Sequence, residues 1–209
     1  MRIVCITVSG EYQRSHSTGR HTTEDEAEHF RALGVPAQFF FGIHASKLGI
    51  TTTVPYEVDT PGSGYIMEPS GTGCWLSHRA LWAALLLLPD EQFLIVEDDA
   101  KFPADWEAQF ETTLRNTPGD WDMIYVGSCC AADKPREHVV GNVWEVRWPF
   151  CTHGYFVTRS ALKKLIETQD EARCYAPIDI SLTLHSLPHL KVYTVLPRIL
   201  DQFVMDLHE

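Results

Sequence analysis

The segment Gln92–Asp99, with the sequence Gln-Phe-Leu-Ile-Val-Glu-Asp-Asp, carries the clearest strand signal in the chain. Phe93–Val96 is apolar at every position, which is typical of a strand that is buried on both faces of a parallel sheet. Glu97, Asp98 and Asp99 follow this strand directly. The segment therefore predicts a central strand with three carboxylates where it ends.

The start of the chain predicts a β-α-β unit. Arg2–Val8 is a β-branched, apolar stretch that is typical of a buried strand. Thr23–Leu33 opens with the capping-box pattern Thr-x-x-Glu and predicts a helix, and Ala37–Phe41 predicts a second strand. Because parallel strands need a crossover connection, we expect an α/β fold with a mostly parallel central sheet flanked by helices.

The remaining segments continue this alternation, and no break in composition divides them. Helices are expected at 77–88, 103–115, 161–169 and 178–187, and strands at 122–126, 142–147, 155–158 and 191–196. Two long stretches, Ser9–Thr22 and Thr51–Gly73, predict loops with little regular structure, the first well placed for a ligand and the second a candidate lid. We therefore expect one domain over residues 1–209.

The charge balance argues against extended nucleic-acid binding. The chain has 28 acidic and 17 basic residues and a formal charge of −11, whereas phosphate contacts need clustered Lys and Arg. The longest apolar run, Ala80–Leu88, is far shorter than the roughly 20 residues of a membrane span. Arg2–Val8 is too short and too β-branched for a signal peptide. We expect a cytoplasmic protein without an integral membrane segment, in solution or peripherally at a membrane.

The six cysteines form no C-x-x-C pair and no zinc-type spacing. We therefore expect them to be reduced, as is usual in the cytoplasm. The alternative is a redox role for the vicinal pair Cys129-Cys130.

The three carboxylates allow two interpretations. Hard oxygen ligands at the end of a strand suit Mg²⁺ or Mn²⁺ that carries a diphosphate. The alternative is a solvated acidic turn. Crowded carboxylates raise one another's pKa values unless a cation is near, so a cation would explain why Glu97, Asp98 and Asp99 stand together.

Other candidate side chains have structural alternatives too. Gly73–His78 predicts a tight turn that feeds a helix, where Ser77 and His78 either meet an anion or act as a helix cap and a core histidine. Asp179, in the first turn of the helix that follows Pro177, is either a general base or a partner of the helix dipole. His153 either contacts a ligand or closes a turn. The chain contains no P-loop, no G-x-G-x-x-G and no G-x-S-x-G motif.

Taken together and in this order, the motifs resemble glycosyltransferase family 25, which includes bacterial lipooligosaccharide galactosyltransferases and collagen galactosyltransferases. The resemblance covers most of the chain. Two departures, the polar loop Ser9–Thr22 and Ser70–Thr72 before the Gly-Cys block, bear on substrate identity more than on fold. The matching segments are Ile3–Val8 with Arg14, Gly73–His78 with Trp82, Phe93–Asp99, Gly154–Thr158 with the helix after it, Pro177–Asp179, and Pro197 with Gln202.

The resemblance implies a GT-A-like, Rossmann-like nucleotide-binding sandwich. It implies a UDP-sugar donor, commonly UDP-galactose, and a divalent cation, commonly Mn²⁺, with Mg²⁺ as the alternative. The implied roles are metal binding for Asp99 and catalysis as general base for Asp179. Binding of the nucleotide-sugar donor is implied for Arg14, Ser77, His78, Glu97 and Asp98. Contact with either acceptor or donor is implied for His153, Tyr155 and Gln202.

Three functions remain open from the sequence. The first is a metal-dependent, inverting hexosyltransferase, for example in lipopolysaccharide biosynthesis, whose acceptor is a glycan, a lipid-linked saccharide or another hydroxyl. The second is a catalytically silent relative that binds a nucleotide sugar or a glycan. The third is a metal-dependent phosphohydrolase that uses the same carboxylates.

Overall fold

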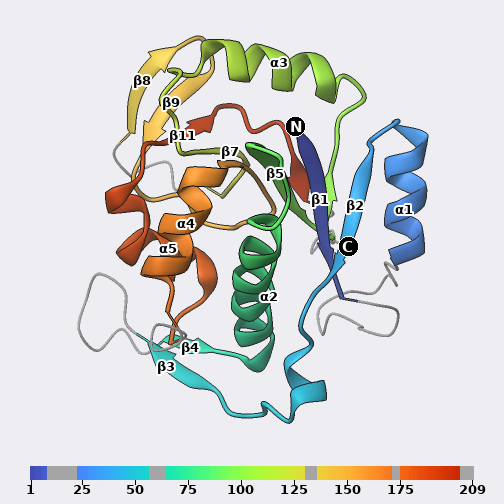
Figure 1. Cartoon of the computed structure of the whole chain (residues 1–209), viewed down its shortest axis with the longest axis vertical. Helices are drawn as coiled ribbons and strands as arrows, with labels where there is room; N and C mark the ends of the chain where they lie inside the picture. Colours follow the sequence, from blue (N-terminus) through green and yellow to red (C-terminus); the bar gives the residue numbers. More distant parts are fainter. Residues whose placement is uncertain (9–22, 57–64, 130–135, 171–174, 203–209) are drawn as a thin grey trace, which may run out of the picture.

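The structure is a computed structural model, and it describes residues 1–8, 23–56, 65–129, 136–170 and 175–202 (Figure 1). Its main feature is an eight-stranded sheet with the strand order β2-β1-β5-β10-β7-β11-β9-β8. In chain order these strands are β1 Arg2–Thr7, β2 Ala37–Phe41, β5 Gln92–Glu97, β7 Met123–Gly127, β8 Arg136–Val140, β9 Val143–Val146, β10 Gly154–Thr158 and β11 Val192–Val195.

Short strand pairs and helices complete the described part of the chain. The two-stranded pairs are β3 Val54–Tyr56 with β4 Tyr65–Met67, and β6 Ala100–Lys101 with β12 Asp201–Gln202. The helices are α1 Thr23–Ala32, α2 Pro69–Leu85, α3 Trp106–Asn116, α4 Arg159–Thr168 and α5 Ile178–His185, with 3-10 turns η1 Ala45–Leu48 and η3 Leu187–His189.

The expected α/β class is confirmed, but the expectation of a mostly parallel sheet is wrong, because the sheet is mixed and most of its neighbouring strand pairs are antiparallel. Strand β1 pairs in parallel with β2 and β5, and β11 pairs in parallel with β7. The other four neighbouring pairs are antiparallel. Antiparallel β10 between β5 and β7 is the main departure from a parallel arrangement. Its amino end therefore lies beside the carboxyl ends of β5 and β7.

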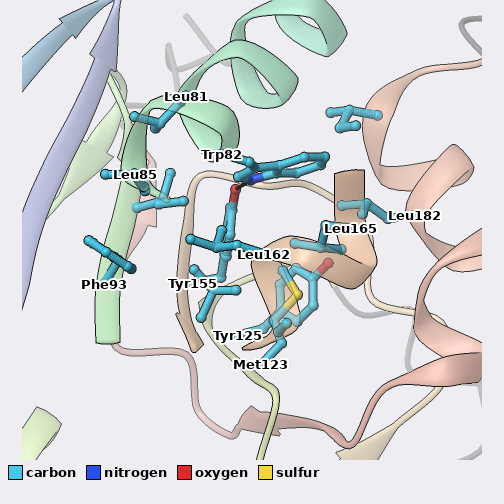
Figure 2. Packing of buried hydrophobic residues seen from close by; sticks show 14 of the residues in the cluster. Leu81, Trp82, Leu85, Phe93, Met123, Tyr125, Tyr155, Leu162, Leu165 and Leu182 are labelled. Atoms are coloured by element: carbon cyan, nitrogen blue, oxygen red, sulfur yellow. Dashed lines mark hydrogen bonds between the residues drawn. The ribbon is translucent and has the colours of Figure 1, made fainter. Parts of the chain in front are cut away.

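The sheet is covered on both faces because its strands alternate two sets of apolar side chains. In β1, Val4 and Ile6 join one core cluster with residues of α2, α4 and α5. Ile3 and Cys5 join the other cluster with residues of α1 and α3. Figure 2 shows the first cluster, in which Trp82, Leu162 and Leu165 pack over the sheet residues Phe93, Met123 and Tyr155.

Strand order reverses its direction at β1. The chain passes from β1 through α1 to β2 on one side, and it later returns to β5 on the other side of β1. Such a reversal leaves a crevice beyond the carboxyl ends of the two strands, where open α/β sheets bind ligands. The ends of β1 and β5 are Thr7 and Glu97.

The sequence placed most of the long elements correctly and missed several shorter features. Helix α2 begins at Pro69, not Ser77, so the expected tight turn at Gly73 is wrong. Strands β3 and β4 form a hairpin inside the stretch 51–73, which was expected to lack regular structure. Strand β8 was not predicted. It pairs with β9 at the edge of the sheet, where four of its five residues have exposed side chains and little apolar patterning.

Cys129 and Cys151 form a disulfide, with 5.6 Å between their Cα atoms. The expectation of reduced cysteines is therefore wrong for this pair, because the sheet brings the end of β7 beside the start of β10. The vicinal partner Cys130 lies outside the described residues. Within the described ranges, no helix combines the length and the apolar character needed to cross a bilayer.

Candidate functional site at the ends of β1 and β5

A cavity of about 860 Å³ opens at the carboxyl ends of β1 and β5. Ile6 and Val8 line it from β1 and the residues that follow, and Glu97 and Asp98 line it from the end of β5. The remaining wall comes from the region of η1 and from the first half of α2. The cavity thus lies at the reversal of strand order, where the fold is expected to bind a ligand.

Helix α2 is docked beside this cavity by a glycine and a serine one turn apart. Ser77 Oγ donates to the Gly73 carbonyl at 2.6 Å and accepts from the Ile43 amide at 2.7 Å. A Cβ atom at Gly73 would lie 2.6 Å from the Ile43 carbonyl oxygen. Ser77 is therefore not the expected helix cap. It lines the cavity and anchors the helix to the chain before η1.

His78 lines the cavity, and its side chain is fully buried in a hydrogen-bonded chain. Its Nδ1 lies 2.8 Å from the Tyr155 hydroxyl. That hydroxyl accepts from Trp82 Nε1 at 2.9 Å (Figure 2). Its Nε2 lies 3.0 Å from Glu97 Oε1. The interpretation of His78 as a hydrogen-bonded core histidine is confirmed, and the same ring also forms part of the cavity wall.

Glu97 is ionised in this setting. Burial raises the pKa of its carboxyl group, but the hydrogen bond from His78 and the electrostatic interaction with that ring, then a hydrogen bond from Thr152, lower that pKa below its usual value. The Thr152 hydroxyl is the donor in that bond. The Cys74 thiol lies 3.9 Å from the same Oε1 atom. Glu97 is therefore the point where α2, β5 and the segment before β10 meet.

The carboxylates of Asp98 and Asp99 lie in different surroundings. Asp98 lies on the cavity wall, and its Oδ2 accepts from the Val8 amide at 3.2 Å. Asp99 is only 8 % exposed and is not among the residues that line the cavity. Its Oδ2 accepts from Gln202 Nε2 at 3.0 Å, because β12 pairs with β6 directly after Asp99. The structure therefore brings Gln202 to the acidic segment.

Asp179 reaches the same edge of the sheet through the segment before β10. Its Oδ2 accepts from the Cys151 amide at 3.0 Å, and the next residue, Thr152, donates to Glu97. Tyr56 of β3 is also near Asp179. Burial raises the pKa of the Tyr56 hydroxyl, and the charge of Asp179 raises it further. Figure 1 shows β3 and β4 close to the start of α5. Cys151 and Thr152 thus link two carboxylates that are distant in sequence.

The remaining predicted residues lie off the cavity wall or outside the described residues. His153 is fully buried, and its Nε2 lies 3.3 Å from the Leu200 carbonyl oxygen. Burial lowers the pKa of its ring, although the nearby Asp99 acts in the opposite direction. Tyr155 is also fully buried and acts on the site through His78. Arg14 lies outside the described residues.

Sequence reasoning missed Cys74 and Thr152 as members of the site. Cys74 precedes His78 by one helical turn, so their spacing in a helix was an available signal. Thr152 had no such signal, because its contact with Glu97 depends on the antiparallel pairing of β10 with β5.

Comparison with known proteins agrees with the motif order. The profile described as "Glycosyltransferase family 25 (LPS biosynthesis protein)" matches residues 17–140. The match includes α2, β5 and the acidic segment, and it covers more than half of the chain. The chain belongs to glycosyltransferase family 25.

Relatives within this family are much longer proteins. A glycosyltransferase 25 family member of Anopheles gambiae is 26 % identical over 73 % of this chain and 27 % of its own length. Human procollagen galactosyltransferase 2 is 29 % identical over 45 % of this chain and 16 % of its own length. A Bos taurus relative, 24 % identical over 63 % of this chain and 22 % of its own length, is named probable inactive glycosyltransferase 25 family member 3. This chain thus spans about a quarter or less of the length of these relatives.

Among solved structures, a glycosyltransferase involved in the glycosylation of the major capsid of PBCV-1 is similar, with a TM-score of 0.49 and 11 % identity. The likeness covers 93 % of this chain and 81 % of that one.

Proposed function

We propose that the chain is a glycosyltransferase that moves a hexose, with galactose as the expected sugar, from a UDP-sugar to an acceptor hydroxyl. The observation that supports this most directly is the cavity at the ends of β1 and β5, with Glu97 and Asp98 on its wall. Its volume of about 860 Å³ lies within the usual range for small-molecule sites. A nucleotide sugar bound there would place its diphosphate near the acidic segment.

A divalent cation fits the donor set of that segment. Carboxylate oxygens are the ligands that Mn²⁺ and Mg²⁺ prefer, and Asp98 presents a partly exposed carboxylate to the cavity. We propose that Asp98 holds the ion from the cavity wall and that Asp99 joins it by giving up its contact with Gln202, with Glu97 outside this site. When bound, the ion would offset the negative charge that develops on the leaving nucleoside diphosphate.

Asp179 is the proposed general base of an inverting transfer. In that reaction the acceptor oxygen attacks the anomeric carbon, the bond to the diphosphate breaks, and the hydroxyl proton passes to a carboxylate. The amide of Cys151 fixes one oxygen of Asp179, and Thr152 ties the same segment to Glu97. Asp179 is also partly exposed, so an acceptor hydroxyl has access to it.

The first test is a binding measurement with a panel of nucleotide sugars. We expect one UDP-sugar to raise the melting temperature in the presence of Mn²⁺, since ligand that binds only the folded state stabilises it by mass action. Asp98→Asn and Asp99→Ala should both lose this shift. The matched control is Asp105→Asn, an exposed aspartate beside α3 whose side chain contacts Gln109.

The second test separates binding from catalysis. Asp179→Asn should abolish sugar transfer and leave the donor-induced shift intact. Unchanged turnover would rule out Asp179 as the base. The wild-type chain could instead show the donor-induced rise in melting temperature but no turnover with any of a broad set of acceptors. That result would favour a silent relative that binds a nucleotide sugar. The existence of relatives that are named inactive makes this second function a specific alternative.

A further inference from the structure

Three side chains of the cavity wall gather one sulfur, one nitrogen and one oxygen donor. Cys74 and His78 lie one turn apart on α2, and Glu97 lies at the end of β5. Glu97 Oε1 is 3.0 Å from His78 Nε2 and 3.9 Å from Cys74 Sγ. All three donor atoms lie within 4.8 Å of one another. All three residues line the cavity.

These separations are close to those of a tetrahedral zinc site. With bonds of about 2.3 Å to sulfur and about 2.0–2.1 Å to nitrogen and oxygen, zinc holds its ligand atoms about 3.3–3.6 Å apart. The observed distances of 3.0 and 3.9 Å bracket that range, so small side-chain movements would suffice. Two ligands one helical turn apart, with a third from another element, form a common zinc arrangement.

The second layer of contacts also suits a metal ligand. Metal-binding histidines use their other ring nitrogen for a hydrogen bond that fixes the ring, and metal-binding carboxylates are themselves hydrogen-bonded. The Tyr155 hydroxyl lies at His78 Nδ1, and Trp82 in turn donates to that hydroxyl. Thr152 donates to Glu97. The ring and the carboxylate are therefore already oriented toward the point between the three donors.

From this arrangement we propose that Cys74, His78 and Glu97 bind a thiophilic divalent cation of the Zn²⁺ class, with the fourth coordination position open to the cavity. On binding, the Cys74 thiol releases its proton to solvent, and Sγ bonds to the metal. The His78 ring bonds through Nε2, and its single proton moves from Nε2 to Nδ1, where it faces the Tyr155 hydroxyl. No electron is transferred. The site is distinct from the proposed Mn²⁺ site, because its sulfur and nitrogen ligands favour softer ions than Asp98 and Asp99 do.

The experiment uses the full chain, freed of metal and kept without reductant, with Co²⁺ and Zn²⁺ as probes. Co²⁺ should bind with one ion per chain and give a thiolate-to-cobalt charge-transfer band and the strong visible bands of tetrahedral cobalt. Zn²⁺ should displace it. Cys74→Ala should remove the charge-transfer band and weaken Zn²⁺ binding at least tenfold. The matched control Cys5→Ala removes a buried thiol of β1 outside the cavity, and it should keep both the band and the affinity.

A second variant shows whether a loss of binding in Cys74→Ala is due to the missing ligand or to misfolding of that variant. Glu97→Gln keeps the thiol and the imidazole but should also weaken Zn²⁺ binding at least tenfold and alter the visible bands. Circular dichroism of each variant confirms that the fold is retained. An unchanged charge-transfer band in Cys74→Ala, or Zn²⁺ binding that is equal in wild type, Cys74→Ala and Glu97→Gln, would overturn the proposal.

The readout does not depend on sugar transfer. Asp98→Asn should lose the Mn²⁺-dependent donor shift of the proposed function while it keeps the cobalt band. If the wild-type chain shows no donor-induced rise in melting temperature but has a normal cobalt band, the result would count against the proposed transferase function alone. Loss of the cobalt band with a normal donor shift would count against the zinc-class site alone.

Discussion

The Tyr155 hydroxyl joins two buried side chains that have no access to solvent. It accepts from Trp82 Nε1 at 2.9 Å (Figure 2), and it lies 2.8 Å from His78 Nδ1. Because Glu97 is ionised and can only accept, His78 donates to it from Nε2. Nδ1 can then accept from Tyr155. A single hydroxyl therefore sets the tautomer of a histidine on the cavity wall.

Tyr155→Phe should destabilise the fold by about 1–3 kcal/mol, because it leaves the buried Trp82 N–H and His78 Nδ1 without their partner. Urea denaturation measures the change. Tyr193→Phe is the control, since the Tyr193 hydroxyl has no hydrogen bond in the described part of the structure, and we expect a change of less than about 0.5 kcal/mol there. Equal effects of the two substitutions would contradict the role of the Tyr155 hydroxyl.

Glu97 makes the fold sensitive to acid. Its pKa is lowered from 4.5 in the folded state, so its ionised form stabilises the fold at neutral pH. That contribution is lost as the pH falls from 4.5 toward the lowered pKa. Glu97→Gln should cost about 1–3 kcal/mol at pH 7, because a charged hydrogen-bond acceptor is removed.

The difference in stability between wild type and Glu97→Gln should shrink as the pH falls below 4.5. Denaturation at a series of pH values measures it. The side chain is 20 % exposed, so screening by solvent is limited. A difference that stays constant down to pH 3 would show that the charge of Glu97 does not stabilise the fold.

Among the elements, α2 depends on an unusually close backbone contact. Replacing glycine by alanine inside a helix normally stabilises it by about 1 kcal/mol. At Gly73 the sign should reverse, because the new Cβ would lie 2.6 Å from the Ile43 carbonyl oxygen, which is backbone and cannot rotate away. We expect Gly73→Ala to destabilise the fold by about 1–3 kcal/mol, as overpacking does.

Thermal denaturation of Gly73→Ala tests this contact. Gly119→Ala is the matched control, because nothing lies within 4 Å of the position that its Cβ would take. That variant should keep the wild-type melting temperature or raise it slightly. A stabilised Gly73→Ala would mean that α2 and the chain near Ile43 do not approach as closely as described.

In the whole molecule, the Cys129–Cys151 disulfide joins the end of β7 to the segment that carries both Thr152 and the donor to Asp179. It spans 22 residues, and closing a loop of that size stabilises a fold by about 3 kcal/mol. The double variant Cys129→Ala/Cys151→Ala should lose about that amount, as should the reduced wild type. Chemical denaturation with and without reductant measures the loss.

The disulfide prediction has a direct chemical check. Alkylation of the native, unreduced protein should leave Cys129 and Cys151 unmodified, and prior reduction should make both reactive. Labelling of both residues without reduction would contradict the bond. The double cysteine variant should also lower the rate of sugar transfer, as Asp179→Asn does. The reason is that the disulfide holds the segment whose Cys151 amide donates to Asp179.

Local patterns were sufficient for the elements that the chain forms from nearby residues. The apolar run before Glu97, the helix expected from Thr23 and the strand at Ala37–Phe41 each depend on neighbours in sequence, and each of these elements is present in the structure. The start of α2 was placed wrongly because Gly73 normally indicates a turn. Its place inside a helix follows from a contact with Ile43, which no local pattern encodes.

By itself, the sequence determined the α/β class, the acidic end of the central strand and the order of the family's motifs, because these depend on periodicity and on residue type along the chain. Only the tertiary structure decided which of those residues meet. The insertion of antiparallel β10 beside β5 brings Thr152 to Glu97 and Cys151 to Asp179 and Cys129. The pairing of β12 with β6 buries Asp99 against Gln202, whereas Asp98 stays on the cavity wall. The physical reason is that strand pairing joins segments distant in sequence, and its register determines which side chains come within bonding distance.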